Sequence, residues 1–150
     1  MGLDMYLNIR KVGNAETEPI NIGYWRKANA IHRFMVGEEA YQSGEDNCKE
    51  FIIPAGKMKA LSVHCWRVLM FFKKKEQDPD YSYELDGTVY TRWEDYAEFE
   101  LPTAEGFFFG DTDYDEYYIQ DLKDTIEIVE KWEEVYKQEG PCETIYYAWY

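Results

Sequence analysis

A long helical pattern near the C-terminal end limits what this chain can fold into. Apolar residues recur at intervals of three and four along residues 116–136, which places them on one face of an α-helix. This apolar stripe consists of Ile119, Leu122, Ile126, Val129, Trp132 and Tyr136. The segment is therefore predicted to be a core helix.

The rest of the same helix is acidic. Glu116, Asp124, Glu127, Glu130 and Glu134 lie outside the stripe. Residues 94–143 hold seventeen acidic residues against three lysines, a net charge of −14 that equals the net charge of the whole chain. Direct binding of nucleic acid through this half is disfavoured, because phosphate contact needs Lys and Arg.

The totals describe one folded domain over residues 1–150. A hydrophobic content of 45% and an aromatic content of 18% exclude wholesale disorder. The longest apolar run is too short to cross a membrane, and the N-terminal residues do not form a signal or transit peptide. Three widely spaced cysteines fit a reducing compartment, so a cytoplasmic location is expected.

Alternation and spacing predict the order of the elements. They indicate strands at 3–11, 48–53, 107–109 and 144–150, and helices at 23–36, at 55–75 and over the long segment that ends at Gly140. Asn21 is expected to cap the helix at 23–36 and Gly37 to end it. The last strand is expected to lie beside the first one. Residues 77–100 are either a hairpin that turns at Asp86-Gly87 or a loop. The expected fold is an α+β two-layer sandwich, with a mixed sheet of four to six strands and about three helices.

Polar side chains interrupt the apolar face of the helix predicted at 23–36. Trp25, Asn29 and His32 fall on one stripe with Val36, and Arg26 lies beside it. Buried polar groups need partners. Asn29 and His32 either bond the backbone of neighbouring loops or line a polar pocket beside Trp25.

An acidic loop precedes the long helix, with Asp111, Asp113 and Asp115 alternating along it and Glu116 directly after it. An EF-hand is excluded, because Glu116 stands where that loop requires glycine and the twelfth residue is not glutamate. A Mg²⁺ or Ca²⁺ site of another kind stays open, although no metal or cofactor is predicted. The simpler interpretation is that Asp113 or Asp115 caps the helix.

The acidic loop and helix together form a candidate partner-binding surface. Their carboxylates would repeat about every 5 Å along the helix axis. Such a stripe would be attracted by a cationic nucleic-acid groove on another protein. A solvated face with no partner fits the composition equally well. The candidate surface comprises Asp111, Asp113, Tyr114, Asp115, Glu116, Tyr117, Asp124, Glu127, Glu130 and Glu134.

Three blocks of sequence support a family resemblance. MGLDMYL at the start, YWRKANAIH and LPTAEGFFFGDTDYDEYYIQDLKDTI cover about a third of the chain. Together they resemble a family of small phage and prophage proteins that begin with the GLDMYL motif. The resemblance implies a mobile-element protein inside a bacterial cell, and it carries over no catalytic residue.

Three functions follow as hypotheses. The first is a phage-encoded acidic protein that inhibits a host nucleic-acid-handling defence complex, of anti-CRISPR or anti-restriction type, by occupying a cationic groove. The second is a small enzyme or ligand-binding protein, with or without Mg²⁺, whose pocket combines Trp25, Arg26, Asn29 and His32 with the Asp111–Asp115 loop. The third is a virion or assembly component. No nucleotide-binding, esterase or zinc motif is present, which weighs against an enzyme. The oligomeric state is not predicted.

Overall fold

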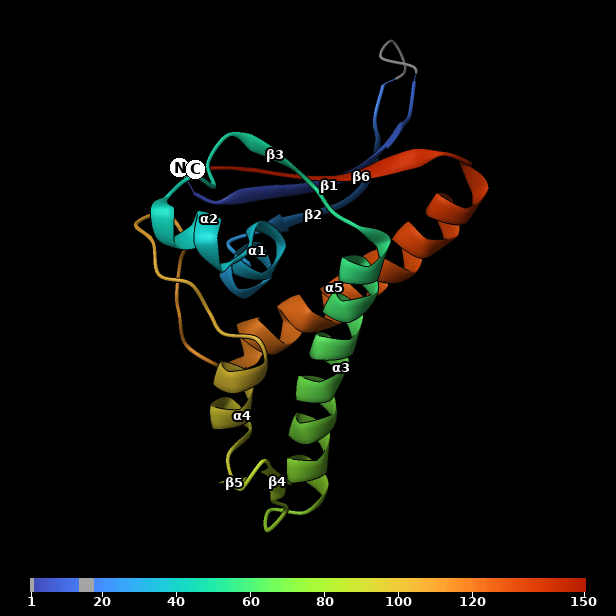
Figure 1. Ribbon diagram of the computed structural model, residues 1–150. Helices are drawn as coiled ribbons and strands as arrows, with labels where there is room; N and C mark the ends of the chain where they lie inside the picture. The colour runs from blue at the N-terminus through green and yellow to red at the C-terminus, as the bar shows by residue number, and fades with distance from the viewer. Residues whose placement is uncertain (1, 14–17) are drawn as a thin grey trace.

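The structure is a computed structural model that describes residues 2–13 and 18–150. It is an α+β fold in which helices cover one face of a four-stranded sheet, as predicted (Figure 1). The strands are β1 (Asp4–Lys11), β2 (Ile20–Arg26), β3 (Lys49–Ile52), β4 (Tyr83–Leu85), β5 (Thr88–Tyr90) and β6 (Cys142–Trp149). The helices are α1 (Asn29–Val36), α2 (Glu38–Ser43), α3 (Ala55–Gln77), α4 (Trp93–Glu100) and α5 (Glu116–Gln138).

The sheet is built around the pairing of the first and last strands. Its order is β2-β1-β6-β3, and β1 pairs with β6 from Asp4↔Trp149 to Lys11↔Cys142. Met5, Leu7 and Ile9 point into the core, whereas the residues between them are half-buried on the other face. The predicted neighbourhood of the terminal strands is therefore confirmed.

Every pairing in the sheet is antiparallel, so the prediction of a mixed sheet is wrong. That prediction placed a helix after the first strand, and a helical crossover would have allowed parallel neighbours. Instead, β2 pairs directly with β1 as its antiparallel neighbour.

The predicted helix at 23–36 is wrong over its first half. Residues 20–26 form β2, and the helix begins only at Asn29, after Lys27 has adopted a positive φ of 57°. Asn21 does not cap a helix, because its side-chain amide donates to Asn8 Oδ1 at 2.9 Å. Gly23 has a packing role, since a Cβ there would lie 2.6 Å from Cγ2 of Ile128 in α5. The predicted end of the helix at Gly37 is confirmed.

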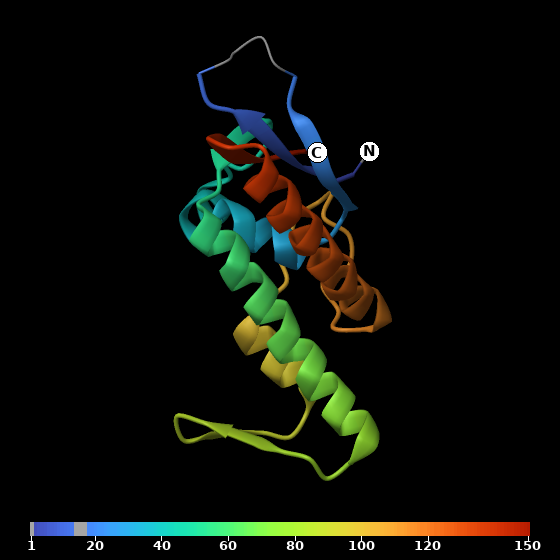
Figure 2. The same cartoon turned by 90° about the vertical axis from the view of Figure 1, so that its right-hand side faces the viewer.

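The long helix α5 packs its apolar stripe beneath the sheet and beside α3 (Figure 2). Two indole N–H groups form hydrogen bonds between α5 and the strands of the sheet. Trp25 of β2 donates to Thr125 Oγ1 at 3.0 Å, and Trp132 donates to Thr144 Oγ1 of β6 at 2.7 Å. Asp115 is the N-cap and accepts from two backbone N–H groups of the first turn, as predicted.

Beyond the sheet, the chain forms an arm. The C-terminal half of α3 extends away from the sheet, accompanied by α4 and the β4–β5 hairpin (Figures 1 and 2). The hairpin with its turn at Asp86-Gly87 is confirmed, and both residues have positive φ values of 49° and 83°. Among the described residues, no helix is long and apolar enough to cross a membrane.

One further prediction was wrong, and one helix was missed. Residues 107–109 form a turn rather than a strand, with Phe107 94% exposed and Phe109 buried. The helix α4 was not predicted, because its eight residues bury only Tyr96 and Ala97 and so show little periodicity. The described residues contain five helices rather than about three, and the additional ones, α2 and α4, are short.

Candidate functional site

A hollow of about 420 Å³ opens where the start of α5 meets the end of β2 and the start of α1. It contains Arg26 and Asn29 of the predicted pocket and Asp111, Asp113 and Asp115 of the acidic loop. The structure thus brings these two predicted groups together. Sequence reasoning missed other residues of the lining, among them Lys27, Thr103, Gln120 and Asp121.

Asn29 holds the acidic loop in place. Its side-chain N–H groups donate to the carbonyl oxygens of Phe109 and Asp111 at 3.0 and 2.9 Å, and its Oδ1 accepts from the N–H of Ala104 at 3.0 Å. The residue is buried. Asn29 therefore bonds the backbone of a neighbouring loop, which was the first of the two expected roles, and it positions the site rather than offering free groups to a ligand.

The three aspartates of the loop lie close together. Asp111, Asp113 and Asp115 each have a carboxylate oxygen within 4.8 Å of the others. Two of them already serve the backbone: Asp111 accepts from the N–H of Asp113 at 2.8 Å, and Asp115 caps α5. The charge of Asp111, followed by burial, raises the pKa of Asp113 above its usual value. The cluster is a concentration of negative charge at a helix N-terminus, where the helix dipole partly stabilises it.

Asp121 is the carboxylic acid of the hollow that burial affects most. Desolvation, helped by the charges of Asp124 and Asp115, raises the pKa of its carboxyl group to about 7. Its position could have been read from the sequence, because it stands three residues after Tyr118 and four before Thr125, on the flank of the buried face of α5. Strongly perturbed acids in a hollow are candidates for functional residues.

Two cationic side chains, Arg26 and Lys27, also line the hollow. Arg26 is held by an ion pair with Asp4 at 2.8 Å. The stem of Lys27 lies against Gly110, where an added Cβ would come within 3.2 Å of the lysine Cδ. The hollow thus has acidic and basic walls, with the acidic side in excess.

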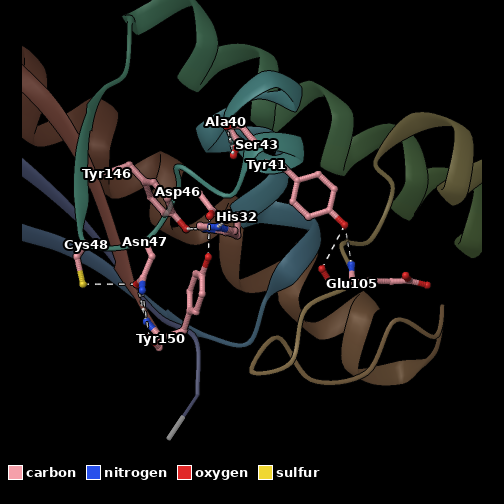
Figure 3. Close-up of polar contacts among 10 residues, drawn as sticks. All are labelled: His32, Ala40, Tyr41, Ser43, Asp46, Asn47, Cys48, Glu105, Tyr146 and Tyr150. Atoms are coloured by element: carbon pink, nitrogen blue, oxygen red, sulfur yellow. Dashed lines mark hydrogen bonds and ion pairs between the residues drawn. The ribbon is translucent and has the colours of Figure 1, made fainter.

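His32 does not take part in this hollow. It is fully buried and bonds Asp46 Oδ2 through Nε2 and the Tyr146 hydroxyl through Nδ1, both at 2.7 Å (Figure 3). The second oxygen of Asp46 accepts from the Tyr150 hydroxyl at 2.7 Å. A neutral imidazole protonated on Nε2 satisfies every group, because it donates to Asp46 and accepts from Tyr146. Burial lowers the pKa of His32, although the hydrogen bond to Asp46 opposes this effect.

The pocket predicted around Trp25 and His32 is therefore wrong for these two residues. Trp25 is buried and turned toward α5, where it bonds Thr125. His32 joins α1 to β6 and to the loop before β3. The prediction assumed that Trp25, Asn29 and His32 lie on one face of a single helix. Trp25 belongs to β2, however, and only Asn29 and His32 belong to α1.

The outer side of α5 carries the acidic face, which we define as Asp124, Glu127, Glu130 and Glu134. All four side chains are exposed. None of them forms an ion pair within the part of the chain that the structure describes, whereas Glu133 on the same helix pairs with Lys137 at 3.2 Å. Asp124 accepts a hydrogen bond from Gln120 at 2.8 Å. The acidic face therefore has carboxylates that no cation of the described fold neutralises.

The remaining residues predicted for partner binding lie at the start of α5. Glu116 and Tyr117 are exposed in its first turn, with Tyr117 82% exposed. Tyr114 is half-buried, and its hydroxyl accepts from the N–H of Thr103 at 3.1 Å. Tyr117 is thus free to contact a partner, whereas Tyr114 has a structural role in bracing the loop.

We predict that His32→Ala destabilises the fold and reduces its sensitivity to acid. The pKa of His32 is lowered on folding, so the unfolded chain binds a proton that the folded chain does not, and stability falls as the pH drops below about 6.5. The free energy of unfolding of the variant should be about 2–4 kcal/mol lower than that of the wild type at pH 7, because the buried Asp46 then has only the Tyr150 hydroxyl as a hydrogen-bond partner. Urea unfolding at pH 7 and pH 5.5 measures both effects. His64→Ala, at a partly exposed histidine, is the control, and an equal loss in both variants would contradict this role.

We also predict that Asp121→Asn stabilises the protein at high pH only. Because folding raises the pKa of this acid to about 7, its ionisation opposes folding as the pH rises from about 4 to 7. The free energy of unfolding of the variant should exceed that of the wild type by about 1–2 kcal/mol at pH 8 and equal it at pH 4. This difference is reduced from the full effect of the pKa shift because the side chain is partly exposed to solvent. Urea unfolding at the two pH values measures this, with the exposed Asp124→Asn as control. An equal gain at both pH values would show that ionisation of Asp121 is not the cause.

Comparison with known proteins adds no family to this description. No protein-family model, no curated protein and no solved structure matches the chain.

Proposed function

We propose that this protein is a phage-encoded acidic binding protein that inhibits a host nucleic-acid-handling defence complex. In this proposal the acidic face of α5 occupies a cationic groove that otherwise holds nucleic acid. The target would be a CRISPR or restriction nuclease in a bacterial cell, the setting implied by the resemblance to phage proteins.

The observation that carries the proposal is the unneutralised acidic face. Its four carboxylates are exposed, and none is paired with a cation of the described fold. Of the three lysines of α5, Lys137 pairs with Glu133, and neither Lys123 nor Lys131 pairs with any of these four carboxylates in the part of the chain that the structure describes. Unpaired carboxylates keep their full attraction for Lys and Arg side chains of a partner.

The dimensions of α5 suit a nucleic-acid groove. Its 23 residues span about 34 Å, which is close to one helical turn of B-DNA. The acidic loop extends the negative surface beyond the N-terminal end of the helix. Tyr117, exposed at this end, adds contact area that loses little conformational entropy on binding.

We predict that reversing three charges of the acidic face abolishes partner binding. The variant Glu127→Lys, Glu130→Lys, Glu134→Lys should fold, because all three side chains are exposed, yet bind its partner at least about tenfold more weakly. The measurement is affinity purification from the bacterial host followed by mass spectrometry, then a binding titration with the recovered complex.

A matched variant separates local charge from total charge. Glu39→Lys, Glu76→Lys, Glu84→Lys changes the net charge equally at exposed sites elsewhere on the molecule. It should retain binding. If both variants bind alike, or if the reversed α5 still inhibits, the acidic face is not the binding surface.

A further inference from the structure

A second candidate surface lies on the arm. An open groove of about 460 Å³ runs between α3 and the β4–β5 hairpin. We call it the α3 groove and define it by Val63, Trp66, Met70, Tyr83 and Leu85, which line it together. It is separate from the acidic face and from the hollow at the start of α5.

The helical wall of the groove is apolar although it faces solvent. Val63, Trp66 and Met70 are 47%, 50% and 45% exposed. The opposite face of α3, with Met58, Leu61, Cys65 and Val68, is already buried in the core. The exposed apolar residues are thus a second stripe that folding of this chain does not use, and clustered exposed apolar groups mark interaction sites.

The spacing of this second stripe matches the seam of a helix pair. Residues 59, 63, 66, 70 and 73 follow one another at intervals of four, three, four and three, which is the heptad pattern of coiled coils. Val63, Trp66 and Met70 occupy its centre, and Lys59 and Lys73 occupy its ends. A groove beside such a stripe suits an amphipathic helix that places residues i, i+3, i+4 and i+7 into it.

The charges along α3 select the partner. The helix α3 carries six cationic residues and one acidic residue, Glu76. Lys59 and Lys73 are exposed and form no ion pair among the described residues, and Lys74 lies over the ring of Tyr81 at 5.2 Å. Glu100 at the edge of the groove already forms an ion pair with Arg67 at 3.2 Å and a hydrogen bond with His64 Nδ1 at 2.8 Å. A partner helix would therefore bind best if it carried acidic residues opposite Lys59 and Lys73, on either side of its apolar stripe.

A second copy of the chain fits this surface poorly. An antiparallel pair of α3 helices would set Lys59 of one copy against Lys73 of the other, and a parallel pair would set each lysine against itself. Neither arrangement supplies an acid to the seam. The exposed face of α5 offers acids but no apolar stripe between Asp124 and Glu134, because its apolar residues are buried or packed against β2.

We propose that the α3 groove binds an acidic amphipathic helix of another protein. Its apolar residues would pack on Val63, Trp66 and Met70, and its carboxylates would pair with Lys59 and Lys73. The protein would then have two docking surfaces, and this one does not rest on the function proposed for the acidic face.

Two synthetic peptides test the proposal on the full-length chain. Both are helical peptides of about 21 residues with leucines at heptad spacing; one has glutamates at the flanking positions and the other has lysines. Fluorescence anisotropy should show saturable binding of the acidic peptide and none of the basic one. No binding of either peptide, or equal binding of both, would overturn the proposal.

Variants assign the binding to the groove. Trp66→Glu should weaken binding by roughly tenfold or more, whereas Val89→Glu, at an exposed apolar residue outside the groove lining, should leave it unchanged. Lys59→Glu with Lys73→Glu should weaken binding and reduce its dependence on salt. The variant with a reversed acidic face should bind the peptide like the wild type, which separates this test from that of the proposed function.

Light scattering after size-exclusion chromatography checks the competing occupant. The wild type should be monomeric in the absence of peptide. A dimer that Trp66→Glu converts to a monomer would show that a second copy fills the groove, and unchanged peptide binding by Trp66→Glu would place the peptide elsewhere. Either result would overturn the proposal.

Discussion

The packing of α5 against the sheet organises the rest of this molecule. Its apolar stripe supplies much of the core, and two indole hydrogen bonds, from Trp25 to Thr125 and from Trp132 to Thr144, fix its position relative to β2 and β6. A helix with one face buried in this way must present its other residues to solvent. Because those residues are mostly acidic, the burial of one face also creates the acidic face. Core and candidate binding surface are thus two sides of one element.

Buried polar residues supply the second level of organisation. Asn29 joins α1 to the loop that leads into α5, and it bonds three backbone groups of that loop. His32, one turn further along α1, joins the same helix to Asp46 and Tyr146. Such groups are costly in a core unless every partner is present, so each favours one arrangement of its neighbours over others. The hydrogen bonds of Asn29 therefore fix the position of the acidic loop relative to α1, and those of His32 fix the position of the C-terminal strand.

Much of the fold could be predicted because its patterns are local. The alternation of Met5, Leu7 and Ile9, the stripe of α5, and the Asp86-Gly87 turn each identify an element without reference to its neighbours. Residues 20–26 could not be assigned this way, because Trp25, Asn29 and His32 happen to repeat at helical intervals. Only pairing with β1 makes this segment a strand, and that pairing is not visible in its own sequence.

The candidate site shows the same division. The acidic loop and the acidic face follow from composition and spacing, whereas the hollow does not, because Lys27, Thr103 and Asp121 come from three separate segments. Polar residues on α1 were recognised as needing partners. The partners of His32 stand 14 and 114 residues away, beyond the reach of any local pattern.

In the proposed function, the acidic face of α5 competes with nucleic acid for a cationic groove. The most direct measurement is displacement of a labelled DNA duplex from the host complex that copurifies with the protein, titrated at two salt concentrations. If the acidic face competes in this way, the protein displaces the duplex completely, and its own affinity for the DNA-free complex, measured at the same two salt concentrations, weakens as salt increases. A stable ternary complex of protein, DNA and host complex, or an affinity of the protein for the complex that salt does not affect, would rule this function out.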